Sequence, residues 1–569
     1  MAQQLKKVMG CLNVLILLAV QTFAGATLSN GYVLCGAYGA KKTVLLDKTA
    51  SIVKVWEHTT PNGYSVYLLE NGNLLRTAQV GDEVKVPDGA GPKQGLIEEV
   101  DPLGNVVWSF QLADEIHCTH HDMKPIPNGN IIAVSFELLT KEQMVEFGLD
   151  TALLAGGGFG SSAKACLAEM IFEVKPDKSG AGNNEIIWEW HIKNHLVPEA
   201  QAGQHPELFN GSMGQLMSNQ WVHLNGLDYC PRRDLIVFTS RVLCEVYIID
   251  HSTTTEEAAG HTGGNHGKGG DILYRWGKPS NFIIDYEFDT TISRRTGDTI
   301  ITQVVKPHPN DWINVLHCCT FIPEGYPGDG NIMFFHNNSD FMSTEVAVSQ
   351  VIELTPPTDA NGHFISAPAT PFGPEQPTWM YAPADSFHSP YMSSALRMHN
   401  GNTLVHEAGP TYGGGMSMGM GTSTNSRLRE VTPSGEMIWS AYIDLSGIQD
   451  TSDTSGAMAF NPPKIMYYPE DYIGITNLFN VNTRKPISAS STSSQQLSPS
   501  IRLKADNICF DNVKDFHLSL FTLNGKQLIL QRSSSDKAKI KISGLPAGTY
   551  MVSACNGASK TSRMITILQ

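Results

Sequence analysis

The sequence predicts an all-β fold, on the basis of its composition and of two repeated patterns. The chain has 569 residues, with 52 Gly and 31 Pro spread along it, which suits turn-rich β structure better than long helices. Hydrophobic residues make up 41% and charged residues 17%, so the chain is globular rather than intrinsically disordered. At about 150 residues per domain, the length allows several domains, or one large repeat fold with an appended domain.

The first pattern is an Asn-Gly-Asn turn followed by an apolar strand. Because Asn-Gly accepts the positive φ of a tight hairpin, each copy predicts a turn ahead of a buried strand. The full copies and variants are Asn71-Gly72-Asn73, Asn128-Gly129-Asn130, Asn400-Gly401-Asn402, Gly330-Asn331-Ile332 and Arg233-Asp234-Leu235.

The second pattern is a β-branched strand that contains a tryptophan, and it alternates with the first. Clear copies end at Trp108, Trp188, Trp276 and Trp439, and Trp56 and Trp379 fit as degenerate copies. Two alternating strand patterns at intervals of about 50 to 100 residues predict propeller blades with insertions between them. The copies predict a six-bladed β-propeller over residues 27–480. A β-sandwich with coincidental hairpins is the alternative, but sandwiches lack a paired long-period repeat.

The first 26 residues have the features of a signal peptide. Lys6 and Lys7 precede the apolar stretch VLILLAV, and Ala24-Gly25-Ala26 is a small-residue cleavage site. A membrane anchor is the alternative, but the apolar run is interrupted and shorter than the ~20 residues that span a bilayer. The sequence offers no later membrane span, so we expect a secreted or cell-surface protein exported through the periplasm.

Charge and cysteine usage narrow the class of partner. The 40 Lys and Arg against 55 Asp and Glu give a net charge of −15, which argues against nucleic acid or an anionic membrane as the main partner. Cys11 leaves with the signal peptide, and the odd number of cysteines that remains requires a free thiol or an intermolecular bridge. Cys318 and Cys319 are adjacent, where a disulfide would be strained, and zinc-type cysteine spacing does not occur.

The composition changes near the C-terminal end. Residues 481–500 contain the Ser-rich stretch SASSTSSQQLSPS and predict a flexible linker. Residues 501–569 alternate apolar and polar positions, which predicts a small β-sandwich with turns at Asn524-Gly525 and Pro546-Ala547-Gly548. The phrases FTLNGKQL and SGLPAGTYMVSA and the final strand MITIL resemble the C-terminal sorting domain of the type IX secretion system of Bacteroidetes. This resemblance implies delivery across the outer membrane by the type IX machinery; a carbohydrate-binding or spacer module is the alternative.

Histidines follow the repeat. Each precedes its turn by a similar distance, so each is expected on the equivalent strand of its blade. Innermost strands of a propeller line a central channel, so these imidazoles are expected to converge on one axis. They are His120 and His121, His223, His317 and His388, and Arg241 adds a cation near the same end.

A ring of imidazoles with one guanidinium suits two chemistries. The first is a metal site, but only Asp122 accompanies the histidines and the HExxH spacing is missing. The second is attack on a tetrahedral oxyanion ester, because neutral imidazole is a nucleophile that needs no prior deprotonation. Arg would bind the oxygens and a second His would protonate the leaving group. The phosphate loop GxxxxGK[ST] is absent, so we predict a donor other than a nucleotide, no cofactor and no metal.

Four phrases in a fixed order resemble the bacterial arylsulfate sulfotransferases: HHDMKPIPNGNII, WVHLNGLDYCPRRDLIVFTSR, GDILYRWGKP, and LHC before GDGNIMFFHNN. The resemblance covers about residues 55–475, and the His-x-Asn phrase with its downstream Ser-Arg is the most specific part. It implies a six-bladed propeller that moves a sulfuryl group from a phenolic sulfate ester to a phenol. The reaction would need no PAPS and would proceed in two steps, by a ping-pong mechanism, through a sulfohistidine.

The resemblance also implies roles for the residues. His317 would be the nucleophile, and His223 and Arg241 would bind the sulfate oxygens. One of His120 and His121 would protonate the leaving phenolate; strand alternation lets only one of them face the channel, and we favour His120. Asn225 would point to the same side as His223 and contact the substrate, and His388 is a further substrate-binding candidate.

The chain departs from the family pattern at the nucleophile. The family often has Gln-His-Asp or Gln-His-Asn, whereas Leu316-His317-Cys318 stands here, after an insertion of about residues 285–314. Two other functions therefore stay open. One is a metal-dependent propeller lyase acting on acidic polysaccharide, which activity in EDTA would exclude. The other is a catalytically silent propeller that binds glycans or host ligands.

Overall fold

The structure is a computed structural model, and the regular secondary structure of its described residues is almost entirely β-strand, with few and short helices, which confirms the all-β prediction. The predicted signal peptide lies outside them, as does the linker except for Ser500. The described ranges are 28–81, 86, 93–149, 165–212, 221–292, 299–338, 348–383, 387–409, 425–444, 461–480, 500–504, 507–511, 517–522, 527–535, 537–543, 545–546, 548–555 and 560–567.

Among the described residues between positions 31 and 469 are six antiparallel sheets of four strands each. The first three are β28 (Ile465–Pro469) with β1 (Gly31–Gly36), β2 (Lys42–Leu46) and β3 (Ile52–Glu57); β4 (Asn62–Leu68), β5 (Leu74–Gln79), β6 (Gly95–Val100) and β7 (Val106–Gln111); and β8 (His117–Pro125), β9 (Ile131–Thr140), β10 (Ala165–Lys175) and β11 (Glu185–His191). The others are β14 (Leu224–Cys230), β15 (Leu235–Ser240), β16 (Glu245–Asp250) and β17 (Tyr274–Trp276); β20 (Leu316–Phe321), β21 (Ile332–His336), β22 (Gln350–Leu354) and β23 (Trp379–Tyr381); and β24 (Ser394–Arg397), β25 (Thr403–Glu407), β26 (Asn425–Val431) and β27 (Met437–Asp444).

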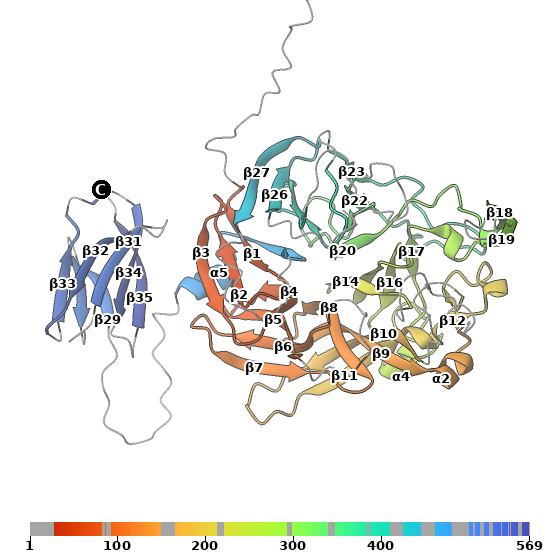
Figure 1. The fold of residues 1–569 in the computed structure, drawn as a ribbon, viewed down its shortest axis with the longest axis horizontal. Coiled ribbons are helices and arrows are strands. Elements are labelled where there is room, and N and C mark those ends of the chain that lie inside the picture. Colours follow the sequence, from red (N-terminus) through yellow and green to blue (C-terminus); the bar gives the residue numbers. More distant parts are fainter. Residues whose placement is uncertain are drawn as a thin grey trace, which may run out of the picture.

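The first strand of each sheet lies at the centre of a ring. These strands contact one another in the order β4, β8, β14, β20, β24, β28 and back to β4. Figure 1 shows the sheets arranged around this common axis, with the later strands of each sheet farther out. Side chains on facing sheets form the apolar core; Trp190 and Phe238 are examples from neighbouring sheets. Residues on the six central strands therefore approach each other although they are far apart in sequence.

One sheet closes the ring by joining the two ends of this region. Its central strand β28 pairs antiparallel with β1, so that Leu34 lies opposite Met466. The sheet therefore cannot form until both segments are present.

The Asn-Gly-Asn turns connect the first and second strands of their sheets, as their sequence predicts. Gly72, Gly129 and Gly401 have φ of 86°, 89° and 88°, so the glycine supplies the left-handed conformation. The structure adds a role for the asparagines. Asn71 and Asn73 both donate to the Glu99 carboxylate on the third strand, at 3.0 and 2.6 Å. Three equivalent carboxylates receive the same contacts: Glu173 from Asn128 and Asn130, Glu353 from Asn331, and Glu430 from Asn400 and Asn402.

The tryptophan pattern marks the outermost strand of each of the six sheets in the ring. Trp56, Trp108, Trp188, Trp276, Trp379 and Trp439 lie on β3, β7, β11, β17, β23 and β27. Several of their indole N–H groups donate to the following sheet or its connections, for example Trp56 to the carbonyl of Asp101 and Trp188 to Thr253. The pattern therefore records contacts between neighbouring sheets.

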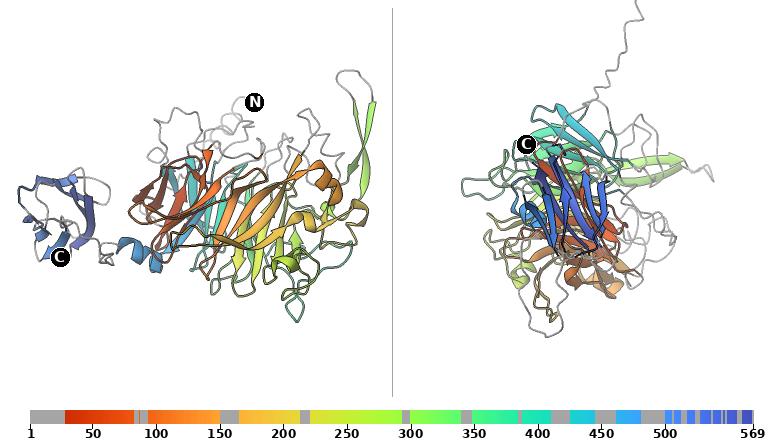
Figure 2. Two further views of the ribbon diagram at one scale, coloured as in Figure 1. Left: turned by 90° about the horizontal axis from the view of Figure 1, so that it is seen from below. Right: turned by 90° about the vertical axis from the view of Figure 1, so that its left-hand side faces the viewer.

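The remaining elements lie in the connections. The insertion before His317 forms a hairpin of β18 (Tyr286–Ile292) and β19 (Thr299–Val305) that projects from the rim of the ring (Figure 2). Two short parallel strands are β12 (Leu196–Val197) and β13 (Phe209–Asn210). The helices are α2 (Lys141–Glu146), α4 (Thr255–Ala258) and α5 (Ile473–Phe479), with 3₁₀ turns η2 (Ile192–Asn194), η3 (Glu199–Gln201) and η4 (Pro279–Asn281). Among the described residues, no helix has the length and apolar character to cross a bilayer.

The C-terminal region forms a sheet of three strands and a sheet of four. They are β29 (Ser500–Lys504), β30 (Asn507–Asp511) and β33 (Lys537–Lys541), and then β32 (Gln527–Arg532), β31 (His517–Thr522), β34 (Gly548–Cys555) and β35 (Lys560–Ile567). Ile508 and Ile540 of one sheet and Leu520 and Val552 of the other belong to one buried cluster. The predicted Asn524-Gly525 turn and Ala547 lie outside the described residues.

Candidate active site

The central strands are irregular where their histidines lie. The pairing register shifts between Thr119 and Met123 in β8, between Leu224 and Gly226 in β14, and between His317 and Thr320 in β20. Next to these shifts, His121, His223 and Cys318 have positive φ of 46°, 54° and 51°. Such bulges and left-handed residues re-aim side chains and carry a backbone cost. The strands are therefore distorted at the points where histidines from different sheets meet.

A chain of hydrogen bonds runs through three of these side chains. The carboxylate of Glu169 on β10 lies 2.7 Å from Nε2 of His120 and accepts the Leu224 N–H at 3.0 Å. Nδ1 of His120 lies 2.7 Å from Nδ1 of His121, and Nε2 of His121 lies 3.2 Å from Nε2 of His223. All four side chains are buried. The order Glu169, His120, His121, His223 therefore forms one buried relay.

The structure places His121, rather than His120, against the next histidine. The rings of His121 and His223 have centroids 4.7 Å apart, whereas His120 is stacked on Phe136 behind them. The expectation from strand alternation assumed a regular strand. That assumption does not hold, because His121 has positive φ inside the β8 bulge.

His317 on β20 is oriented by Asn337. Its Nδ1 lies 2.6 Å from Oδ1 of Asn337. The amide nitrogen of Asn337 donates to the carbonyls of Ser389 and Met392, so Oδ1 is the atom that faces the ring. Because that oxygen only accepts, Nδ1 of His317 carries the hydrogen and Nε2 keeps its lone pair.

The electrostatics keep these imidazoles uncharged. Burial lowers the pKa of His317 to about 3, with Arg241 acting in the same direction and the Asn337 hydrogen bond opposing it. Burial, followed by neighbouring positive groups, also lowers the pKa of His121 and His223 well below the ordinary value. His317 and Arg241 both act on His121 and His223, so the four groups belong to one electrostatic cluster. Arg241 is fixed beside His223, whose carbonyl accepts its backbone N–H at 3.0 Å.

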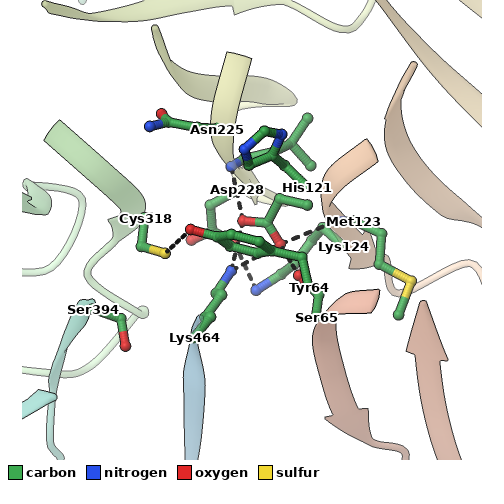
Figure 3. A network of polar contacts seen from close by, with 12 residues as sticks. Tyr64, Ser65, His121, Met123, Lys124, Asn225, Asp228, Cys318, Ser394 and Lys464 are labelled. Carbon is green, nitrogen blue, oxygen red and sulfur yellow. Dashed lines mark hydrogen bonds and ion pairs between the residues drawn. The ribbon is translucent and has the colours of Figure 1, made fainter. Parts of the chain in front are cut away.

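A buried ion pair lies next to this cluster and links the central strands. Nζ of Lys464, just before β28, lies 2.9 Å from Oδ2 of Asp122 and 3.0 Å from Oη of Tyr67. Asp122 also accepts from Ser65 at 2.5 Å and from the Leu227 N–H at 3.0 Å. Figure 3 shows Ser65, His121 and Lys464 of this region converging from separate strands. The carboxylate beside the histidines is therefore committed to a structural network.

Comparison with known families bears directly on this cluster. Residues 166–355 match the arylsulfotransferase (ASST) family, and residues 501–568 match the secretion system C-terminal sorting domain. Both resemblances seen in the sequence are thereby confirmed. Residues 166–355 are thus similar to the arylsulfotransferase family. The sorting domain indicates export to the cell surface or secretion.

The solved structures to which the chain is similar have low sequence identity and low TM-scores. The periplasmic gluconolactonase PpgL of Pseudomonas aeruginosa is 11% identical, covers 77% of this chain and 99% of its own, and has a TM-score of 0.34. The β-propeller domain of Cps50 (Swd1) from Myceliophteria thermophila is 9% identical; the match covers 73% of this chain and 88% of that domain's chain, with a TM-score of 0.30. At these scores the likenesses assign no activity to the chain. No curated protein sequence matches it.

The segment that matches the arylsulfotransferase family contains most of the cluster. It includes Glu169, His223, Arg241, His317 and Asn337, whereas His120 and His121 precede it.

The two candidates for substrate contact lie at the edge of this arrangement. Asn225 donates to the Leu316 carbonyl at 2.7 Å and accepts from Thr239 at 2.8 Å, so its amide links β14 to the strand that carries His317. His388 is half-buried in the segment before β24, next to Ser389, whose carbonyl accepts from Asn337.

Sequence reasoning missed Glu169 and Asn337. Glu169 lies within a buried strand with no motif around it, and Asn337 lies in the phrase FFHNN without an assigned role. A glutamate inside the otherwise apolar run from Ala165 to Phe172 is the signal that could have pointed to Glu169.

The thiols of Cys318 and Cys319, beside His317, are buried, which disfavours the reactive thiolate form. Burial raises the pKa of Cys318 to about 12 and that of Cys319 well above its ordinary value. Sγ of Cys318 lies 3.6 Å from Oη of Tyr64. All eight cysteines for which the structure describes a state are free thiols.

Proposed function

We propose that this protein is a PAPS-independent arylsulfate sulfotransferase that works through a sulfohistidine at His317. The observation that carries this proposal is the fixed tautomer of His317. Its protonated nitrogen is held by Asn337 and its other nitrogen has a lone pair, in a cluster that lowers its pKa to about 3. An imidazole in this state is a nucleophile across the neutral pH range. Asn337 also supplies the polar partner that the sequence around His317 lacks.

The proposal extends to the fold. The six four-stranded sheets would be the blades of a six-bladed propeller over residues 27–480, and the two C-terminal sheets would form a β-sandwich over residues 501–569. Ring contacts between the first strands and the shared cluster of the C-terminal sheets support these readings.

In the first half-reaction, Nε2 of His317 attacks the sulfur of the bound ester. An N–S bond forms, and the S–O bond to the aryl group breaks with its electron pair on the phenolate oxygen. Charge on the transferring group is spread over its oxygens, which suits positioned cationic and N–H donors. Arg241 and His223 would supply them, since both belong to the electrostatic cluster around His317.

His121 would be the acid that protonates the leaving phenolate. It is neutral in the free protein, because its pKa is lowered by burial and by the other positive groups. A bound sulfate ester brings a negative charge, which raises the pKa of nearby imidazoles and allows one proton to be taken up. The Glu169 carboxylate, acting through His120, would balance the positive charge that His121 then carries.

The second half-reaction reverses these roles. His121 takes the proton of the phenol acceptor, the phenol oxygen attacks sulfur, and the N–S bond returns its pair to His317. The net change is the exchange of a sulfuryl group between two phenols, with no cofactor. Asn225 would act as a positioning residue for β20, and His388 would border the substrate.

The test is transfer from 4-nitrophenyl sulfate to a phenol, with EDTA present and no nucleotide. We expect acceptor-dependent nitrophenolate release by the wild type and none by His317→Ala, with a sulfonated His317 peptide when the acceptor is omitted. His399→Ala, which changes an exposed histidine, is the matched control. Absence of release by folded wild type would overturn the proposal and favour a propeller that only binds ligands.

A further inference from the structure

A second group of potential ligands lies outside the channel. It consists of His195, His261 and Asp271, whose ligand atoms all lie within 4.8 Å of one another. Over the part of the chain that the structure describes, this is the group whose His, Cys and carboxylate atoms come close enough to share a metal ion. His195 follows η2, and the other two lie in the connection between α4 and β17. Two segments that are separate in sequence therefore bring these side chains together.

The hydrogen bonds of His195 fix its tautomer. Its ring is fully buried, and Nε2 lies 2.8 Å from the carbonyl oxygen of Ala258. A carbonyl only accepts, so Nε2 carries the hydrogen. In the neutral ring, Nδ1 then presents a lone pair.

That lone pair faces another acceptor. Nδ1 of His195 lies 2.9 Å from Oδ1 of Asp271, and Nδ1 of His261 lies 2.7 Å from the same oxygen. A neutral imidazole nitrogen and a carboxylate oxygen repel at this distance unless a proton or a cation lies between them. A metal ion between the two imidazole nitrogens and the carboxylate oxygen would remove this repulsion.

The composition of the group favours a metal ion. Two imidazole nitrogens and one carboxylate oxygen are a common ligand set for zinc, with bonds of about 2.0–2.1 Å. Tetrahedral geometry separates such ligand atoms by about 3.3 Å, so small shifts of these side chains would admit the ion. The side chain of His261 is 59% exposed and is free to make such a shift.

The surroundings of His195 are built around its ring. The ring lies parallel to Trp190, with an angle of 5° between the planes, and the Trp190 indole donates to the Gly270 carbonyl at 2.7 Å. A side chain at position 270 would place its Cβ 2.1 Å from the Ala258 carbonyl and 2.6 Å from Nε2 of His195. Glycine is therefore required where the connection passes His195. A backbone carbonyl bound to the far nitrogen is also the usual support for a metal-ligating histidine.

We propose that His195, His261 and Asp271 form a binding site for a divalent transition metal of the zinc type. The fourth position faces solvent, since His261 is exposed, and would hold water. The bound ion ties the connection before β17 to the segment after β11. It does not belong to the proposed sulfuryl-transfer chemistry.

The experiment is equilibrium zinc binding by the full chain after removal of metal with EDTA. We expect the wild type to bind one more equivalent of zinc than His261→Ala, and zinc to raise the melting temperature of the wild type alone. His205→Ala is the matched control, because this half-exposed histidine pairs with the single carboxylate of Glu207 at 3.1 Å. His205→Ala and His223→Ala should both keep the zinc.

Two results would overturn the proposal. One is equal zinc binding by the wild type and His261→Ala. The other is loss of the zinc in His223→Ala but not in His261→Ala, which would place the ion in the channel. Because the transfer assay runs in EDTA, its outcome is independent of this one.

Discussion

The molecule places histidines in two clusters with opposite surroundings. In the channel cluster, His121 lies against His223, and His317 and Arg241 act on both of them electrostatically. Two carboxylates lie nearby: Glu169 reaches His121 through His120, and Asp122 pairs with Lys464. In the second cluster, which consists of His195, His261 and Asp271 and is called the rim cluster below, both imidazoles contact the same oxygen of Asp271. A carboxylate between imidazoles favours a cation, whereas imidazoles packed with a guanidinium remain neutral and can bind an anion. The charge of the neighbours, rather than the number of histidines, separates the two chemistries.

The sharpest test of this contrast is a pair of variants, one in each cluster. His317→Ala should lower the rate of sulfuryl transfer by about 10⁴-fold or more, because it removes the covalent nucleophile, and it should leave zinc binding intact. His261→Ala should lose the zinc and keep the transfer rate. Parallel assays of both variants measure this, and a rate loss in His261→Ala would show that the clusters are coupled.

Acid should destabilise the protein through the channel cluster. The folded-state pKa values of His121, His223 and His317 are lowered, so the unfolded chain binds more protons below about pH 6.5. Their stability contribution is complete above that pH and is lost as the pH falls toward the folded-state values. Each imidazole adds a slope of about 1.4 kcal/mol per pH unit.

Urea unfolding between pH 7 and pH 5 measures this slope, and tryptophan fluorescence is a suitable probe because all tryptophans precede residue 440. His317→Gln should reduce the slope by one imidazole's share. An unchanged slope in His317→Gln would contradict the assignment.

Glu169→Gln tests whether acid–base catalysis by His121 depends on the Glu169 carboxylate, which reaches it through His120. The amide keeps the contact with His120 but removes the charge that balances protonated His121. We expect kcat/KM to fall about 10- to 100-fold for aryl sulfates whose phenols are weak acids, because their departure needs the proton. The loss for 4-nitrophenyl sulfate should be much smaller. Equal losses for both donors would remove the acid–base role from this relay.

Asn337→Asp places a carboxylate against the imidazole of His317, as Asp271 lies against the imidazoles of the rim cluster. A carboxylate at Nδ1 of His317 favours the charged ring, so the pKa should rise from about 3 toward the ordinary value. The wild-type kcat/KM should show no loss from His317 protonation down to about pH 4, whereas the variant should lose about tenfold between pH 7 and pH 5. Profiles that coincide would show that Asn337 does not control His317.

The repeats revealed the framework of the ring but not the details of the site. The Asn-Gly-Asn turns and the tryptophans locate the first, second and outermost strands because the same hairpin and the same contacts between sheets recur. The position of His121 could not be predicted from alternation, since the bulge at Thr119–Met123 changes the direction of the side chains. Glu169 and Asn337 act across strands that are distant in sequence, so only the folded chain shows their partners. The rim cluster joins residues 195 and 271 for the same reason.

The pairing of β1 with β28 has a consequence for the order of folding. Residues near position 34 pair with residues near position 466. Because this sequence separation is large, closure of the ring is expected to be a late and slow step of folding. The strand that closes the ring also brings Lys464, so Asp122 remains a buried carboxylate without its cation until that moment. Because His121 adjoins Asp122 in the same bulge, the channel site is expected to mature only when nearly all of the ring sequence is available. A chain caught before closure would thus be both structurally open and catalytically inactive, which suits a protein that must cross a membrane before it works.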